Sequence, residues 1–154
     1  MAMSTTARLP WTYRPLGVRV MLTFLVAVLL GMVAFLWFAL PGSVRDDFTP
    51  FQVATLLLLL AVALTGVYGL MRCRVRATDD GVEIVNVFRR RQLEWAQILQ
   101  VSQRRGDPWA VLDVDDGTAV AVMAIQGSDG ARARAAVLLL RGLVEAHTRT
   151  SRDD

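Results

Sequence analysis

The sequence predicts a membrane helical hairpin joined to an α+β domain, in which an antiparallel, partly open β-barrel is capped by one C-terminal helix. Three observations lead to this fold class. Hydrophobic residues make up 54% of the 154 residues, and two uncharged segments hold much of that excess. After residue 71, turn signals rich in Asp, Gly and Pro recur at short intervals, as they do between short strands. The last part of the chain switches to a helical period.

The two uncharged segments are residues 20–40 and 51–71, each 21 residues long. As helices they would span about 31 Å, close to the roughly 30 Å hydrocarbon core of a bilayer. The first is too long for the apolar part of a signal peptide, and no small-residue cleavage site ends it. We therefore predict two transmembrane helices, joined by an outer loop at residues 41–50.

The arginines around these segments predict the topology. The 41–50 loop contains only Arg45, beside Asp46 and Asp47. Six arginines flank the other ends of the two helices: Arg8, Arg14, Arg19, Arg72, Arg74 and Arg76. By the positive-inside rule, the N-terminal segment 1–19 and everything after residue 71 are cytoplasmic, in a multi-pass protein of the plasma membrane.

The two helices are expected to act as an anchor, because transport and intramembrane catalysis need ionisable groups at depth and these segments have none. Small residues at four-residue spacing predict that Ala27 and Gly31 pack against Ala61 and Thr65. The chain has one Cys and one His, no phosphate-binding glycine loop and no paired catalytic carboxylates. We expect no enzyme activity, no cofactor and no metal site.

The domain at residues 72–147 reads as about six short strands and one helix. The strands are predicted near 72–77, 82–87, 92–95, 97–105, 110–114 and 118–125, with Arg89 and Arg90 at one hairpin tip. A helix of about 18 residues follows a cap at residues 127–129 and ends near His147, because Ala133, Val137, Leu140 and Val144 fall on one face. Residues 148–154 are expected to be a flexible tail.

An ordered set of short motifs carries a family resemblance. The set comprises residues 78–82, the three arginines at 89–91, the spacing Leu93-x-Trp95-x-x-Ile98-x-x-Val101 and residues 105–110. With the two helices before it, this set resembles the bacterial PH-like domain proteins, specifically the actinobacterial group that includes low-molecular-weight protein antigen 6. The resemblance implies a PH-like barrel at the cytoplasmic membrane and no enzyme activity. Phosphoinositide-binding PH domains use a basic loop between their first two strands. The turn taken to correspond, Asp79-Asp80-Gly81, is short and acidic and would repel an anionic headgroup.

Two groups of residues are candidate sites. Arg89, Arg90 and Arg91 form a compact positive cluster, and Arg72, Arg74 and Arg76 share one strand face, so both groups are predicted to contact the membrane surface; a solvated hairpin tip is the alternative for the first group. Nucleic acid is not expected as a partner because residues 72–154 hold 13 Arg against 12 Asp plus Glu, which leaves no broad basic surface.

The second candidate site is a protein-partner surface at Asp107, Pro108 and Trp109, since this tryptophan follows a turn and is expected to be partly exposed. Trp95, in an apolar run, is expected in the core. Asp113, Asp115 and Asp116 lack the ligand spacing of a calcium loop and indicate a hairpin turn.

These observations predict a membrane-anchored interaction or scaffold module on the cytoplasmic face of the inner membrane. Its partners would be membrane lipid and a protein, with no nucleic acid and no small-molecule substrate. Two alternatives stay open: a sensor of anionic lipid at the inner leaflet, and an accessory subunit of a larger membrane complex.

Overall fold

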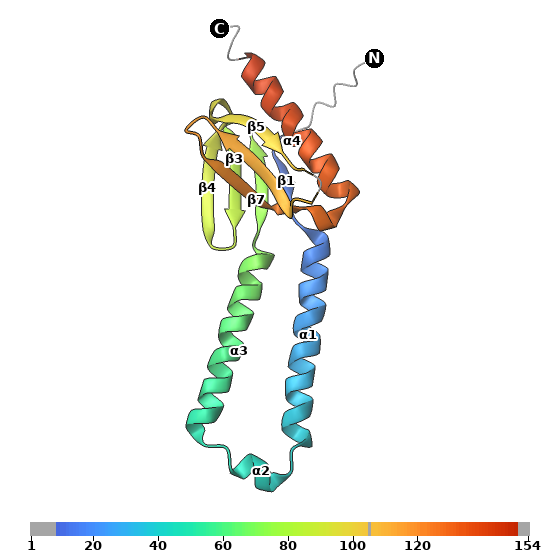
Figure 1. Cartoon of the computed structure of the whole chain (residues 1–154), viewed down its shortest axis with the longest axis vertical. Coiled ribbons are helices and arrows are strands. Elements are labelled where there is room, and N and C mark those ends of the chain that lie inside the picture. Colours follow the sequence, from blue (N-terminus) through green and yellow to red (C-terminus); the bar gives the residue numbers. More distant parts are fainter. Residues whose placement is uncertain (1–8, 105, 151–154) are drawn as a thin grey trace.

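The structure is a computed structural model that describes residues 9–104 and 106–150. A helical hairpin extends from one end of a β-barrel (Figure 1). Along the chain the elements are β1 (Trp11–Tyr13), α1 (Leu16–Ala39), α2 (Gly42–Asp46), α3 (Pro50–Met71), β2 (Arg74–Thr78), β3 (Gly81–Asn86), β4 (Arg89–Glu94), the 3-10 turn η1 (Trp95–Gln97), β5 (Ile98–Ser102), β6 (Trp109–Val114), β7 (Ala119–Gln126), the 3-10 turn η2 (Gly127–Asp129) and α4 (Ala131–Thr150).

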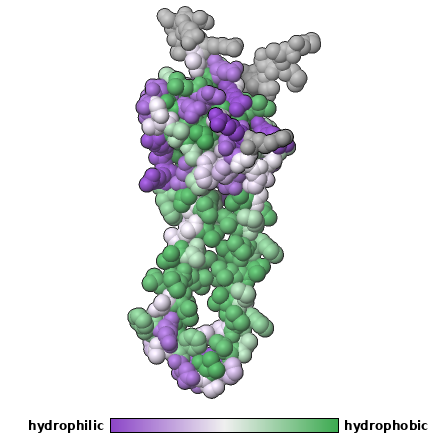
Figure 2. All heavy atoms as spheres, viewed as in Figure 1, coloured by the Kyte–Doolittle hydropathy of each residue, from purple (hydrophilic) through white to green (hydrophobic). Residues whose placement is uncertain are grey.

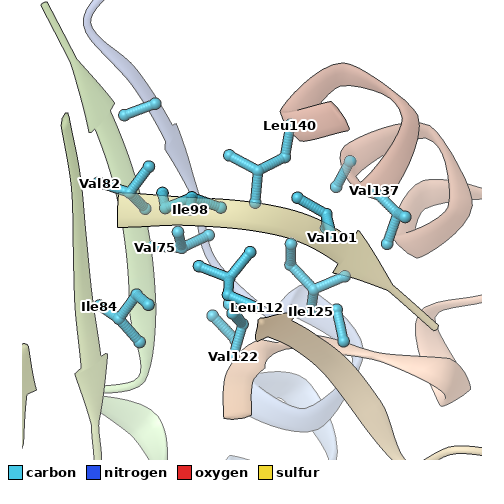
Figure 3. Packing of buried hydrophobic residues seen from close by; sticks show 14 of the residues in the cluster. Val75, Val82, Ile84, Ile98, Val101, Leu112, Val122, Ile125, Val137 and Leu140 are labelled. Atoms are coloured by element: carbon cyan, nitrogen blue, oxygen red, sulfur yellow. The ribbon is translucent and has the colours of Figure 1, made fainter. Parts of the chain in front are cut away.

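The barrel consists of two antiparallel sheets with the strand orders β1-β2-β3-β4 and β5-β6-β7. Inward-facing residues of both sheets meet the apolar face of α4, and Ile84, Leu112, Ile125 and Leu140 are each at most 1% exposed (Figure 3). The predicted fold class is therefore confirmed: an antiparallel, partly open barrel capped by one C-terminal helix and joined to two long apolar helices.

The first strand, β1, is absent from the sequence-based prediction. It lies in the predicted N-terminal segment and pairs with β2, with Trp11 opposite Ala77 and Tyr13 opposite Val75. Three residues are too few to show a strand period, so only the pairing reveals it. Because β1 precedes the predicted strands, the expectation that residues 79–81 join the first two strands is wrong. The connection between the first two strands is the whole helical hairpin, whereas Asp79 and Asp80 join the second strand to the third.

The tip of the β3–β4 hairpin also differs from the prediction. Val87 and Phe88 form the turn, and Arg89 and Arg90 already belong to β4. Val87 adopts a left-handed conformation with φ 55°, and its N–H lies 3.3 Å from the Cys73 sulfur. Both turn residues approach Gly69 of α3. Contacts with α3 therefore fix this turn at Val87 and Phe88, although neither residue type is favoured in turns.

The C-terminal helix buries the predicted face: Ala133, Val137, Leu140 and Val144 are at most 6% exposed. The expected cap at residues 127–129 forms the 3-10 turn η2, and the helix begins directly after Gly130, at Ala131. It also continues past His147 to Thr150, so residues 148–150 of the expected tail are helical. Residues 151–154 of that tail, like residues 1–8 of the expected N-terminal segment, lie outside the described residues.

Helices α1 and α3 are long and apolar enough to cross a membrane, and their surface is a band of hydrophobic side chains between two polar ends (Figure 2). The predicted packing of Ala27 and Gly31 on Ala61 and Thr65 is wrong. All four residues are exposed, and a Cβ at Gly31 would meet no atom of the described residues within 4 Å. The helices instead border an apolar hollow of about 540 Å³ near their α2 ends.

The separation of the two helices has a cause at the barrel. The start of α1 is fixed against η2, where a Cβ on Gly17 would lie 2.7 Å from Asp129 Oδ1. The end of α3 is fixed against the β3–β4 turn, where a Cβ on Gly69 would lie 2.5 Å from Val87 Cγ1. Each helix is therefore positioned by a different part of the barrel, and small residues in midhelix do not decide their spacing.

Candidate functional site

A hollow of about 400 Å³ lies where the helical hairpin meets the outer face of the first sheet. Five arginines line it, and we call it the arginine pocket. The remaining lining is largely apolar and includes Met71, Val85 and Phe88. The five arginines are Arg14, Arg19, Arg72, Arg74 and Arg90.

The fold brings these arginines together from three separate stretches of sequence. Arg14 follows β1, and Arg19 lies in the first turns of α1. Arg72 caps the end of α3, with Arg74 opening β2 two residues later. The sheet register then places Arg74 opposite Val85 and Val85 opposite Arg90, so these three side chains form a row across the outer face.

One carboxylate serves two of these arginines. Glu83 accepts a hydrogen bond from Arg74 Nη2 at 2.9 Å and another from Arg90 Nη2 at 3.1 Å. The hydrogen bond from Arg74, helped by the charges of Arg90 and Arg76, holds the pKa of Glu83 below its usual range, although burial opposes this. The pocket therefore keeps a positive excess even with Glu83 ionised.

The other three arginines make no ion pair within the described part of the chain. The guanidinium of Arg72 lies over the Tyr68 ring, 5.7 Å from its centroid. The Nε atoms of Arg19 and Arg74 are enclosed by protein and have no hydrogen-bond partner among the described residues. Guanidiniums without a carboxylate partner around one hollow favour an anionic ligand with oxygen acceptors.

The predicted membrane-contact residues divide between two places. Arg72, Arg74 and Arg90 line the pocket, while Arg76 is exposed farther along β2. Arg89 and Arg91 line a different hollow, of about 420 Å³, together with residues 118–121. The expected compact cluster at 89–91 is therefore wrong, because successive residues of a strand point to opposite faces of the sheet.

Sequence reasoning used Arg14 and Arg19 as topology signals only. Arg14 and Arg19 flank the first apolar segment in the way that Arg72 and Arg74 flank the second. This symmetry could have indicated that the four arginines lie at the same end of the hairpin. Their convergence with the other arginines depends on the pairing of β1 with β2, and that pairing was not predicted.

The predicted partner surface lies on the turn at residues 106–109, beside η2. Pro108 is exposed and Trp109 half-buried, and the Pro108 carbonyl accepts a hydrogen bond from Gly127 N at 3.0 Å. Asp107 caps the turn by accepting a 2.7 Å hydrogen bond from Arg104 N. Since η2 also contacts the start of α1, this surface is close to the end of the barrel from which the helices emerge (Figure 1).

The joint between β1 and η2 is polar. The Tyr13 hydroxyl donates a 2.8 Å hydrogen bond to Asp129 Oδ2, and the guanidinium of Arg132 lies 5.6 Å from the Tyr13 ring centroid. Burial, followed by the hydrogen bond to Asp129 and its charge, raises the pKa of Tyr13 to about 12. Tyr13 is therefore a neutral donor at physiological pH.

The remaining candidates have structural roles. Trp95 is 6% exposed in the core, as predicted, and its Nε1 donates to the Thr78 carbonyl at 3.0 Å. His147 stacks on Trp95 at 4.4 Å between ring centroids, a contact the sequence did not indicate. Asp116 accepts hydrogen bonds from Thr118 across the predicted turn. In residues 9–104 and 106–150 no group of three His, Cys, Asp or Glu side chains could hold a metal ion.

Comparison with known proteins finds similarity over the barrel and part of α4. Residues 72–143 match the family model of bacterial PH domains, so the match runs from the start of the barrel after α3 into α4. Uncharacterized proteins of Mycobacterium tuberculosis and Mycobacterium bovis are 36% identical over 73 residues, which is 47% of this chain and 47% of each relative. No solved structure gives a significant match. These matches support a bacterial PH-like domain and do not distinguish the antigen 6 group within it.

Proposed function

We propose that the protein is a membrane-anchored PH-like interaction module. In this proposal α1 and α3 cross the plasma membrane, the barrel and both termini are cytoplasmic, and the barrel binds a protein partner at the inner face. One observation carries the proposal: the helical hairpin connects two paired strands, β1 and β2. Both helices therefore enter the barrel through one sheet, which fixes the face that the barrel presents to the membrane.

The charge distribution supports this orientation. The five arginines of the arginine pocket surround the barrel ends of the helices, whereas the far end contains Arg45 next to Asp46 and Asp47. Positively charged residues favour the cytoplasmic side. Helices of 24 and 22 residues are long enough to cross the hydrocarbon core with some tilt.

The 106–109 turn is the protein-partner surface in this proposal. It has exposed backbone at Gly106, an exposed Pro108 and a half-buried Trp109, and such a tryptophan is suited to an interface. The turn lies next to η2, near the helix ends, so a partner docked there would itself be close to the leaflet. This placement favours a membrane-protein partner and the role of an accessory subunit.

Response to anionic lipid is a second candidate function, and the arginine pocket favours it. The five guanidiniums sit at the barrel ends of the two helices. If those helices span the membrane, the pocket lies at the level of the lipid headgroups, where each basic residue contributes about 1 kcal/mol of attraction to an anionic surface.

Cysteine accessibility tests the topology. Cys73 is only 2% exposed, and a Cys73→Ser background removes it altogether. In that background we expect Ser43→Cys to react with an impermeant maleimide in intact spheroplasts. Gln100→Cys, exposed on β5, should react only after the membrane is permeabilised. The reverse pattern, or labelling of both positions in intact cells, would contradict the proposed orientation.

Site-specific photocrosslinking tests the partner surface. A photoreactive residue at position 108 should give a discrete crosslinked protein in membranes. The same residue at position 99, where Leu99 is 66% exposed on β5, is the matched control. We expect Trp109→Ala to abolish the position-108 product without changing the amount of protein in the membrane. Equal products at positions 108 and 99 would remove the 106–109 turn as the partner surface.

A further inference from the structure

We infer that the arginine pocket binds the headgroup of a single phospholipid that carries two phosphate groups, taken from the cytoplasmic leaflet. The inference rests on the proposed function, because the pocket meets lipid headgroups only when α1 and α3 cross the membrane. It goes further by naming the ligand, its charge and the residues that hold it.

The position of the pocket fits a lipid headgroup. Its rim includes Arg19 from α1 and Tyr68 and Met71 from α3, so it opens where the apolar helix surface meets the barrel. Tyr68 is 58% exposed, and tyrosine is enriched at the boundary between hydrocarbon and headgroups. On the same helix as Arg19, Val20 and Phe24 are 69% and 70% exposed, so α1 carries apolar surface that acyl chains can contact.

The positive charge of the pocket favours a ligand that carries more than one negative charge. Five guanidiniums surround it, and the nearby Glu83 is already hydrogen-bonded to Arg74 and Arg90. Arg14, Arg19 and Arg72 have no carboxylate partner within the described residues. A lipid with one phosphodiester carries one negative charge and would leave most of this excess unpaired. Two phosphates provide two charges and enough oxygens for several guanidinium hydrogen bonds.

The arginines of different elements indicate where the two phosphates lie. Arg19 and Arg74 both line the pocket. Their Nε atoms are enclosed by protein, so a ligand would meet the outer part of each guanidinium. Arg19 belongs to α1, whereas Arg74 belongs to β2. Because the two guanidiniums come from different elements around one hollow, we assign one phosphate to the Arg19 side and the other to the Arg74 side. Basic pockets at the cytoplasmic ends of membrane helices are known to hold such doubly charged headgroups.

The apolar part of the pocket favours lipid over an acidic protein segment. Met71, Val85, Val87 and Phe88 contribute to its lining. A glycerol backbone placed against these side chains would bury apolar surface while its phosphates reach the guanidiniums. A carboxylate-bearing peptide would have to enter at the plane of the membrane surface to reach the same groups.

Native mass spectrometry of the full chain tests the inference. The protein is released from nanodiscs containing either cardiolipin, with two phosphates, or phosphatidylglycerol, with one, at equal total lipid charge. We expect one retained cardiolipin per chain and a preference over phosphatidylglycerol of about tenfold or more. Equal retention of the two lipids would overturn the assignment of two phosphates.

A matched pair of double variants tests the location. Arg14→Gln with Arg72→Gln removes two positive charges from the pocket, and Arg89→Gln with Arg91→Gln removes two from the opposite face of the sheet. The first pair should lower cardiolipin retention by about tenfold or more, and the second should leave it within about twofold of the wild type. Equal losses in both pairs would show a nonspecific charge effect and overturn the site.

Two further measurements separate the possible failures. Glycerol bisphosphate in solution should not displace the retained lipid, and displacement at equal concentration would reassign the pocket to a soluble phosphate ligand. The Ser43→Cys and Gln100→Cys labelling is repeated in both double variants. If the labelling keeps the proposed orientation while lipid preference is absent, the headgroup inference alone is wrong. If the orientation itself fails, the proposed function is wrong as well.

Discussion

The helical hairpin and the barrel use the same apolar residue types in opposite ways. In the barrel, Leu112 and Leu140 are 0% exposed and lie among other buried side chains (Figure 3). In α3, Leu57 and Leu58 are 61% and 64% exposed, and the surface of the hairpin is largely hydrophobic (Figure 2). The barrel is therefore stabilised by its own packing, in the way that a water-soluble domain is. The hairpin has little internal packing, so its apolar surface depends on what surrounds it.

The two regions are nevertheless tightly joined. Helix α3 meets the β3–β4 turn at Gly69 without room for a side chain, and α1 meets η2 at Gly17, where a Cβ would press on the Asp129 carboxylate. Cys73, directly after α3, is 2% exposed. The hairpin is therefore loosely packed along its length and fixed at its base.

The largest effect on stability is expected from truncating a leucine in the barrel core. Truncating a leucine in the hairpin is the matched control. Leu140→Ala leaves a cavity at the centre of the barrel, and we expect it to lower the free energy of unfolding by about 2–5 kcal/mol. Leu57→Ala removes the same atoms from an exposed position and should change it little. The readout is the rate at which the only cysteine, Cys73, reacts with a thiol reagent in increasing denaturant, for protein in detergent. Comparable losses in both variants would show that the hairpin is packed internally after all.

A second test compares two glycines in one helix. A leucine at Gly69 would place its Cβ 2.5 Å from Val87 Cγ1 and 2.9 Å from Phe88 Cζ, while a Cβ at Gly66 would meet no atom within 4 Å. We expect Gly69→Leu to destabilise the barrel by about 1–3 kcal/mol through overpacking. Gly66→Leu, which gains the same helix propensity, should be neutral or slightly stabilising. Cys73 labelling again reports the difference, and a neutral Gly69→Leu would contradict the fixed base.

The third test removes one hydrogen bond at the base of α1. Tyr13→Phe deletes the donor to Asp129 Oδ2 and should cost about 0.5–1.5 kcal/mol. The sign of its pH dependence follows from the raised pKa. Because burial and Asp129 raise the pKa of Tyr13 from 10.0 to about 12, the wild type's advantage is complete below pH 10 and is lost as the pH rises through 12. Denaturation midpoints of both proteins at several pH values measure it, and a constant difference up to pH 12 would contradict the assignment.

The sequence predicts well where the local pattern is long enough to be read. The two apolar helices, the face of α4 and the position of Trp95 followed from length, period and hydrophobicity. Three features did not follow, and each depends on contacts between distant segments. β1 has only three residues and is visible only through its pairing with β2. The Val87-Phe88 turn is set by Gly69, and the spacing of the helices by their separate anchors on the barrel.

The arginine pocket shows the same limit. Arg72, Arg74 and Arg90 were predicted to contact the membrane, and they line one hollow. Arg14 and Arg19 join them only because β1 pairs with β2, and β1 was not predicted. Separating Arg89 and Arg91 from them required the correct hairpin tip, because a tip places all three arginines together whereas a strand sends neighbours to opposite faces. Local errors in element boundaries therefore became errors in the composition of the site.

The smallest effect is expected from Glu83, which among the described residues is the carboxylate paired with arginines of the pocket. Its side chain is 12% exposed, but those of Arg74 and Arg90 are 41% and 65% exposed, so solvent screens the pairs. We expect Glu83→Gln to lower the free energy of unfolding at pH 7 by less than about 1 kcal/mol. The hydrogen bond from Arg74 holds the pKa of Glu83 below its usual range. The stabilisation is therefore present above the ordinary glutamate pKa and is lost as the pH falls through the lower, folded-state value.

Urea midpoints of the wild type and Glu83→Gln should accordingly converge in acid and separate towards neutrality. High salt should reduce the separation, because the arginines are accessible to ions. If the Arg19 and Arg74 sides of the pocket each hold a phosphate, cardiolipin should also bind Glu83→Gln more tightly, since one competing carboxylate has been removed. Midpoints that stay parallel across the acid range would show that Glu83 is not ionised against these arginines. The positive excess of the pocket would then be larger than the structure indicates.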